Sequence, residues 1–172
     1  MTPRLPALLL ASALLAACAT PPPAAPPATA FDAVAAVAAI RAAAGPADAK
    51  DELAIQPLRD PAVEDLRAQA RREEAAGRHA ESAAALDRAL ALIPDDPAVL
   101  QERAEAALLA HDLPAAATFA TKAHEVGAQV GPLCRRHWAT LRTVRTELHD
   151  AAGTREAQAR YDACRVAAPP RY

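Results

Sequence analysis

The apolar and polar positions divide the chain into three successive regions. Residues 5–17, LPALLLASALLAA, form an uncharged apolar run that follows Arg4. Residues 19–30, ATPPPAAPPATA, have no periodicity and contain five prolines, which favours a semi-extended polyproline spacer. From Phe31 onward, apolar residues recur mostly at helical spacing. The pattern predicts an apolar leader, a spacer and a helical domain.

A first helix is predicted over residues 31–44, FDAVAAVAAIRAAA. Its larger apolar residues recur every three positions and can form one stripe, which consists of Phe31, Val34, Val37 and Ile40. Gly45 and Pro46 end the helix. It could be docked on the domain or mobile. The following segment, up to residue 62, reads as a loop, in which ELAIQPL could lie extended against the domain.

The apolar run at the start has the layout of a secretory signal peptide. It is too short for a membrane span, which needs about 20 apolar residues. Residues 15–18, LAAC, resemble the lipobox of bacterial lipoproteins. This resemblance implies cleavage of residues 1–17 and acylation of Cys18, including palmitate, which would anchor the protein to a membrane. The alternative is an ordinary signal peptide in which Cys18 is incidental.

The residue after the cysteine bears on the location. In lipoproteins of this kind an Asp at that position usually retains the protein at the inner membrane, and this chain has Ala19. The resemblance therefore implies an outer-membrane lipoprotein that faces the periplasm, with residues 18–30 as its tether.

Composition narrows the fold class. Aromatic residues make up 3% of the chain, and alanine dominates the 52% of apolar residues. Small side chains suit closely spaced helices, and few residues favour a sheet. Without residues 1–17 the chain loses Arg4, so 18 basic residues stand against 21 acidic ones, a net charge of −3. This balance gives no support to nucleic-acid binding, and we expect a single all-α domain.

The chain resembles itself at a shift of 34 residues. The aligned pairs are Leu66 with Leu100, Ala70 with Ala104, Leu86 with Ala120, and Ala89 with Ala123. This pattern resembles the tetratricopeptide repeat, in which a large residue opens helix A, small residues lie where helix A meets helix B, and a turn precedes helix B. Gly77 and His111 fall at the turns. At the junction of the two units, Asp96 is expected to cap the next helix and Pro97 to fit its first turn.

A third unit aligns at a shift of 41. Leu141, Ala157 and Cys164 then take the repeat positions, Arg145 takes that of an alanine, and the turn falls near residues 152–153. The seven additional residues equal about two helical turns, so they predict a longer helix A. The resemblance implies a short right-handed α-solenoid of three hairpins. The predicted bounds are 31–62 for the first helix and loop, 63–96, 97–130 and 131–169 for the hairpins, and 170–172 for a tail.

With Cys18 lipidated, two cysteines remain in a compartment that oxidises thiols. Both lie at the end of the third hairpin away from its turn, and we expect a disulfide between Cys134 and Cys164. If the helices cross near residue 151, however, the two cysteines are offset by about 6 Å along the axis, and local unwinding at VGPLC would be needed. Two separate buried thiols are the alternative. A zinc site with His137 lacks further ligands at recognisable spacings.

The sequence contains no recognisable catalytic pattern. The five histidines are scattered, and no phosphate loop, dinucleotide fingerprint, nucleophile elbow or distinct carboxylate pair is present. We therefore expect no enzymatic activity, no metal and no cofactor.

The family resemblance implies binding, because helices A of tetratricopeptide repeats line a concave groove for peptides. The matching positions here are Arg67, Arg71, Gln101, Glu105, Arg142 and His149. Trp138, the only tryptophan, is a candidate interface anchor, although packing against the second repeat explains it equally well. A solvated face is the alternative for each groove position.

Lipobox, tether and repeat together predict a non-enzymatic adaptor in envelope assembly or maintenance. It would be anchored in the outer membrane and bind a protein or peptide, and its oligomeric state is left open. One alternative is an assembly factor for a pilus or secretion pore, resembling repeat-containing pilotin lipoproteins. Another is a structural lipoprotein that associates with itself.

Overall fold

The computed structural model describes residues 30–45 and 59–167. Apart from Ala30, these residues belong to one compact unit, Phe31–Tyr172. The predicted signal peptide, Cys18, the tether up to residue 29, ELAIQPL and the tail lie outside the described residues. Within the described ranges the chain forms seven α-helices and no β-strand, which confirms the all-α class. None of these helices has the length and apolar character needed to cross a membrane.

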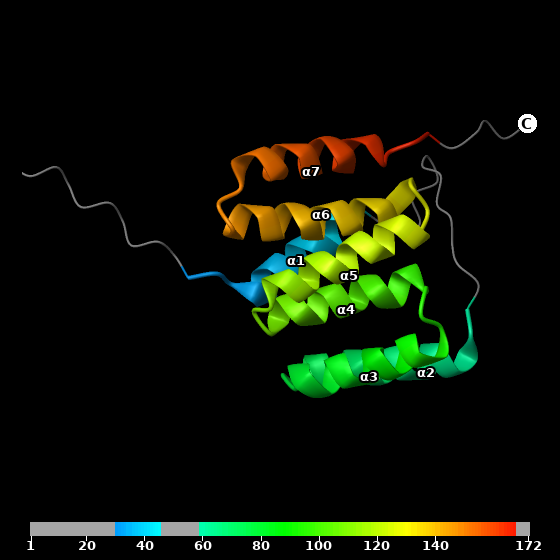
Figure 1. Cartoon of the computed structure of the whole chain (residues 1–172). Coiled ribbons are helices and arrows are strands. Elements are labelled where there is room, and N and C mark those ends of the chain that lie inside the picture. Colours follow the sequence, from blue (N-terminus) through cyan, green and yellow to red (C-terminus); the bar gives the residue numbers. More distant parts are fainter. Residues whose placement is uncertain (1–29, 46–58, 168–172) are drawn as a thin grey trace, which may run out of the picture. The chain divides into compact units, whose positions relative to one another are not determined.

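Six of the helices form three hairpins that stack in chain order (Figure 1). The hairpins are α2 (Pro61–Ala75) with α3 (His79–Leu92), α4 (Pro97–Leu109) with α5 (Leu113–Val126), and α6 (Gly131–Glu147) with α7 (Ala151–Ala163). Within the stack, α3 packs on α4 and α5 packs on α6. The predicted stack of three hairpins is therefore present.

The first two hairpins begin with the same local signal, an aspartate followed by a proline. The side chains of Asp60 and Asp96 each accept hydrogen bonds from the backbone N–H groups two and three residues later. The proline stands where a backbone N–H would have no partner within the helix. The cap predicted at Asp96 is thus confirmed. These starts are 36 residues apart because α2 is two residues longer than α4 at its N-terminus. From Val63 onward the predicted shift of 34 holds, since the ends of α2 and α4 and the turn residues Gly77 and His111 are 34 positions apart.

All three hairpins turn in the same way. Gly77, His111 and His149 have left-handed φ angles of 74°, 58° and 57°. In each turn the following residue donates its N–H to the carbonyl five positions earlier, at 2.9 Å. Asp112 and Asp150 then cap the second helix of their hairpins. A recurring His-Asp pair therefore marks the second and third turns.

The third turn predicted near residues 152–153 is wrong. Asp150 accepts the N–H of Gly153 at 2.8 Å, which places Gly153 inside the first turn of α7. The additional length of α6 over α4 is four residues rather than seven. Counted back from the turns, Trp138 replaces Leu141 as the counterpart of Leu66 and Leu100. Arg142, rather than Arg145, stands where the other hairpins have Ala70 and Ala104.

This earlier turn brings the two remaining cysteines opposite each other. Residue 149 lies midway between Cys134 and Cys164, so antiparallel helices place the two at the same height. Their Cα atoms are 5.7 Å apart and a disulfide joins them. The predicted bond is confirmed, whereas the predicted unwinding is wrong because α6 already begins at Gly131. The alternatives of two separate thiols and of a zinc site are excluded by this bond.

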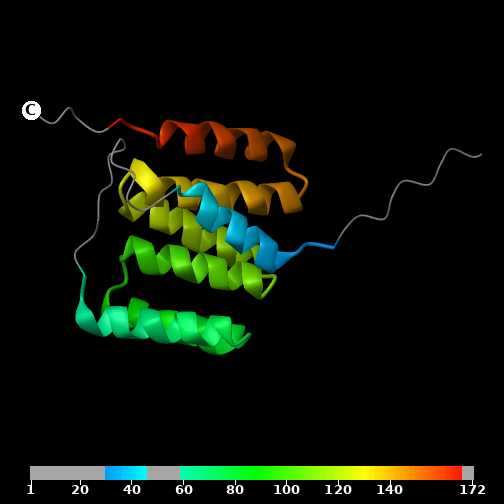
Figure 2. The same ribbon diagram turned by 180° about the vertical axis from the view of Figure 1, so that it is seen from behind.

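The remaining helix, α1 (Ala33–Ala43), lies across α4 and α6 (Figure 2). Ala33, Val37 and Ile40 are buried against them, whereas Val34 is 65% exposed. The stripe predicted at a constant spacing of three is therefore wrong at Val34. Because a helix turns once every 3.6 residues, spacings of four and then three keep residues on one face. Of the two alternatives, the docked helix is the one observed.

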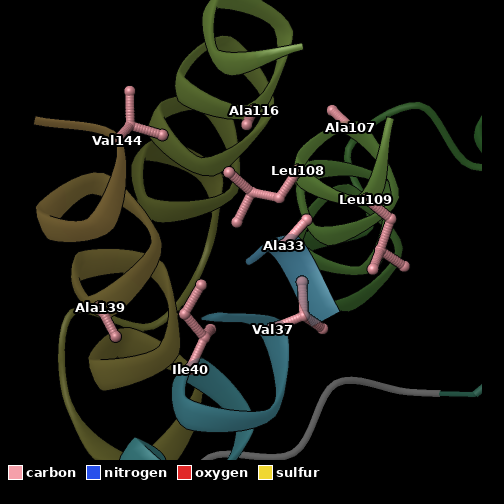
Figure 3. Packing of buried hydrophobic residues seen from close by; sticks show 9 residues of the cluster. All are labelled: Ala33, Val37, Ile40, Ala107, Leu108, Leu109, Ala116, Ala139 and Val144. Atoms are coloured by element: carbon pink, nitrogen blue, oxygen red, sulfur yellow. The ribbon is translucent and has the colours of Figure 1, made fainter. Parts of the chain in front are cut away.

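Small side chains let the helices approach closely. The fully buried alanines with 0% exposure are Ala85, Ala89, Ala104, Ala116, Ala120, Ala123 and Ala139. One apolar cluster gathers where α1, α4, α5 and α6 meet, with Leu108, Ile40 and Val144 as large members (Figure 3). A second cluster joins α2, α3 and α4. This packing fixes the positions of the polar side chains described next.

Candidate functional site

The first helices of the three hairpins, α2, α4 and α6, share one side of the stack, which we call the first-helix face. Helix α1 covers the part of this face formed by α4 and α6. Beside α1 there remains a hollow of about 320 Å³. Its lining residues are Arg41, Ala70, Arg71, Glu74, Ser82, Leu86, Glu102 and Arg136. It lies on the face where the repeat resemblance predicts a groove.

A buried carboxylate, Glu105 of α4, links the helices around this hollow. Its side chain is 0% exposed. Arg41 of α1 donates to it at 2.8 Å, Arg136 of α6 at 2.6 Å, and Gln101 at 2.9 Å. A buried carboxylate needs such partners, because removal of the charge from water is costly. Glu105 therefore organises the contact between three helices and is not exposed to a ligand.

The network continues into the contact between α4 and α6. The amide nitrogen of Gln101 donates to Glu105 and to Thr140, so the amide oxygen Oε1 faces His137. Because Oε1 can only accept, Nδ1 of His137 donates to it, at 2.8 Å. Desolvation lowers the pKa of His137 to about 3, so its imidazole is neutral at pH 7. Nε2 of His137 is buried and has no hydrogen-bond partner among the described residues.

On the side toward α2, Arg41 reaches a second carboxylate. Its two terminal nitrogens donate to Glu74 at 2.7 and 2.9 Å, in a bidentate pair. These hydrogen bonds are the main cause that lowers the pKa of Glu74 and raises that of Arg41. One guanidinium thus ties α1 to both α2 and α4.

A second bidentate pair joins α2 and α4. Arg67 donates to Glu102 at 2.9 and 2.7 Å, and this hydrogen bonding is the main cause that raises the pKa of Arg67. Arg71, one helical turn further along α2, is 56% exposed, with its guanidinium 3.8 Å from Glu102. Arg71 is therefore the predicted groove residue that a ligand in the hollow would meet most directly.

Trp138 lies elsewhere, in a hollow of about 350 Å³ lined by α5, α6 and α7. Its ring centre is 4.8 Å from that of His124, and the guanidinium of Arg160 lies 5.9 Å from the ring. Burial is the main cause that lowers the pKa of His124. The indole thus packs between the second and third hairpins. This is the alternative that the sequence analysis gave in place of an interface anchor.

The last two predicted groove residues belong to the third hairpin. Arg142 donates to Gln158 of α7, and its guanidinium lies 5.4 Å from the ring of Tyr161. His149 is exposed and forms the α6–α7 turn. The seven predicted residues therefore do not form one site: two line or border the open hollow, two are buried beneath α1, and three lie around the third hairpin.

Sequence reasoning missed Arg41, Glu74 and Arg136, which complete the network. The one available signal was Arg41 itself, because it is the sole charged residue in AVAAVAAIRAA. The partners of the network lie 31 to 64 positions apart in the sequence, so their pairing depends on the stacking of the hairpins.

The arrangement suits recognition. Around the hollow, guanidinium and carboxylate groups are paired and Arg71 is partly free to meet a ligand. In the described part of the chain, no group of three or more His, Cys, Asp or Glu side chains is placed to hold a metal ion. The hollow is therefore lined by helices that ion pairs join, with one partly exposed guanidinium at Arg71.

No protein-family model matches the chain, and no curated protein matches it significantly. Among solved structures, the globular C-terminal domain of P. aeruginosa LpoP is similar in fold, with a TM-score of 0.57 and 24% sequence identity. The likeness covers 61% of this chain and 99% of that chain. At this level of identity it concerns the fold alone, and it agrees with the all-α stack described above.

Proposed function

We propose that the protein is a non-enzymatic adaptor of the cell envelope. Its helical domain binds a protein partner on the first-helix face, and an acylated Cys18 anchors it to the outer membrane on the periplasmic side. The observation that carries the binding role is the hollow beside α1, where Arg71 is exposed on rigid helical walls. The sequence LAAC and the proline-rich spacer support the anchor and the tether.

Two further features agree with this proposal. The disulfide suits a compartment that oxidises thiols. The bidentate pair of Arg67 with Glu102 holds α2 and α4 together, so this part of the groove is formed before a partner arrives. A preformed groove favours binding because little conformational entropy is lost on association.

Crosslinking in intact cells followed by mass spectrometry tests the binding role. We expect a protein partner that is crosslinked to the wild-type protein and lost when Arg71 is replaced by Glu. Arg155→Glu is the matched control, because it makes the same charge change at an exposed position of α7. Equal crosslinking of both variants, or no partner at all, would contradict the proposal.

The anchor is tested separately through Cys18→Ala. The wild-type protein should incorporate labelled palmitate and fractionate with outer membranes, whereas the variant should lose the label. Label retained by the variant would disprove lipidation at Cys18. An oligomer of the detergent-solubilised protein that persists on dilution would instead favour the self-associating lipoprotein.

A further inference from the structure

Helix α1 occupies a site on the first-helix face without belonging to a hairpin. Its 11 residues are fewer than the roughly 12–15 that an isolated helix needs for marginal stability in water. The helical form of α1 therefore depends on its contacts with α4 and α6. We call the surface that receives it, formed by α4, α6 and Tyr161 with Glu74 at its edge, the α1 seat.

The seat first receives an apolar stripe. Ala33, Val37 and Ile40 pack into the cluster that contains Leu108 and Ala139. These three positions follow the spacing i, i+4 and i+7, which is the pattern of a helix that lies in an apolar groove. Phe31 and Ala43 pack against the same cluster from partly buried positions.

The seat next receives one positive charge. Glu105 and Glu74, from two different helices, both accept hydrogen bonds from Arg41, at position i+8 of the stripe. Glu105 also keeps Arg136 and Gln101 as partners. The carboxylates are therefore arranged to select a helix with a guanidinium at this position, because Arg matches carboxylates in bidentate geometry.

Finally, the seat receives the end of a helix. Tyr161 donates its hydroxyl to the carbonyl of Ala43 at 2.8 Å, and Arg135 donates to the carbonyls of Ala43 and Ala44. Gly45 follows with a φ of 78°, and a Cβ at Gly45 would lie 2.9 Å from Nη2 of Arg135. These contacts involve backbone carbonyls and a missing Cβ, so they fit the C-terminus of any helix that ends in glycine.

From these three features, and building on the adaptor function above, we propose that the α1 seat is the recognition site for a partner helix and that α1 is its resident ligand. The partner helix carries apolar residues at i, i+4 and i+7, an arginine at i+8 and a glycine at i+12. It displaces α1 when it binds. The open hollow supports this occupant, because Arg41 forms one of its walls and the hollow therefore gives access to the edge of the seat.

A synthetic peptide of residues 30–45 with a fluorescent label is the probe, and the full chain purified from envelopes in detergent is the receptor. In the wild-type protein α1 competes at an effective concentration on the order of millimolar, so the peptide should bind weakly. Val37→Asp in the chain should release α1 and tighten peptide binding at least about tenfold. Val34→Asp is the matched control and should bind like the wild type, because Val34 is exposed on the same helix.

The peptide itself tests the arginine. An Arg41→Gln peptide should bind the Val37→Asp protein about tenfold more weakly than the unaltered peptide. Equal affinity of the two peptides, or equal peptide affinity of the wild-type and Val37→Asp proteins, would overturn the proposal. A wild-type dimer that Val37→Asp dissociates and Val34→Asp preserves would assign the seat to α1 of a second copy, and this too would overturn it.

Amide hydrogen exchange of the unmodified protein provides a readout that needs no variant. The amides of α1 should exchange at least about tenfold faster than those of α4 and α6, since α1 must open on its own. Equal protection of the three helices would overturn the proposal even if Val37→Asp failed to fold. None of these measurements uses a cellular partner, so their failure is distinct from a failure of the crosslinking test.

Discussion

The first and third hairpins end the same stack in different ways. The third hairpin is closed by the disulfide between Cys134 and Cys164, and Tyr161 and Arg135 bind the end of α1. The first hairpin is joined to the stack by the packing of α3 on α4 and by ion pairs such as Arg67 with Glu102. The third hairpin thus has a covalent bond between its own two helices, whereas the first hairpin depends on apolar packing and ion pairs.

The difference shows that the two ends of the stack depend on different interactions. The open hollow lies between α1 and α2, beside the hairpin that has no disulfide. The seat of α1 has its far end on the disulfide-bonded hairpin. In the proposed recognition, the C-terminus of the partner helix would meet the disulfide-bonded hairpin and its arginine would face the hollow.

The largest expected effect comes from removal of the covalent closure. The double substitution of Cys134 and Cys164 by Ala should lower the free energy of unfolding by about 3 kcal/mol, because the bond closes a loop of about 30 residues. Urea denaturation followed by circular dichroism measures this loss. Hydrogen exchange should show faster opening of α7 with little change in α2 and α3, and a uniform increase over all hairpins would refute the contrast between them.

The next effect is a dependence on pH at the contact between the second and third hairpins. His137 has a pKa of about 3 in the folded protein and an ordinary value of 6.5 when unfolded. Between these values the unfolded chain binds a proton that the folded protein does not, so stability is present above pH 6.5 and is lost as pH falls toward 3. From pH 7.5 to pH 5 this loss is about 2 kcal/mol.

Urea denaturation at several pH values measures this slope. The variant His137→Asn, which keeps a donor for Gln101, should have a flatter slope than the wild type over this range. His124, whose pKa is also lowered by burial, contributes in the same direction. Identical slopes would show that His137 does not carry the effect.

A smaller effect is expected at the first hairpin. A double-mutant cycle on Arg67 and Glu102, whose side chains are 15% and 13% exposed, should give a coupling energy of about 1 kcal/mol. The pair of Arg103 with Asp87 serves as a comparison, because Asp87 is 51% exposed and its coupling should be below about 0.5 kcal/mol. Equal coupling energies of the two ion pairs would show that burial does not determine the coupling.

The smallest effect is expected at Val34. Replacement of this exposed residue by Ala should change the free energy of unfolding by less than about 0.5 kcal/mol, whether measured by urea or by heat. A loss of several times that size would indicate that α1 presents another face to α4 and α6.

Part of the fold follows from signals in the sequence. Asp96 with Pro97 marks the start of a helix, and the pairing of the two cysteines is predicted from their number and from the compartment expected for a lipoprotein. The repeat length also predicts His111 as a turn residue. These features depend on adjacent residues or on spacings within one hairpin or one repeat, so a single sequence is sufficient to find them.

Other features depend on contacts that the sequence pattern does not contain. In α1, alanines surround the valines on all sides, so burial of Ala33 rather than Val34 leaves almost no trace in the pattern. The predicted third turn lies too late because a shift of 41 aligns Leu141 with Leu100, whereas the turn residues His111 and His149 are 38 positions apart. The pairing of Glu105 with Arg41 and Arg136 arises from the stacking of hairpins, and the repeat resemblance assigned Glu105 to an open surface instead.

The disulfide has a consequence for the order in which the hairpins form. Both cysteines belong to one hairpin, so their oxidation requires only that α6 and α7 meet and does not require the assembled stack. A loop of about 30 residues closes readily, because the entropy cost grows slowly with length. The chain can therefore acquire its covalent bond within this hairpin first, and the closed hairpin then provides a template on which the second hairpin and α1 pack.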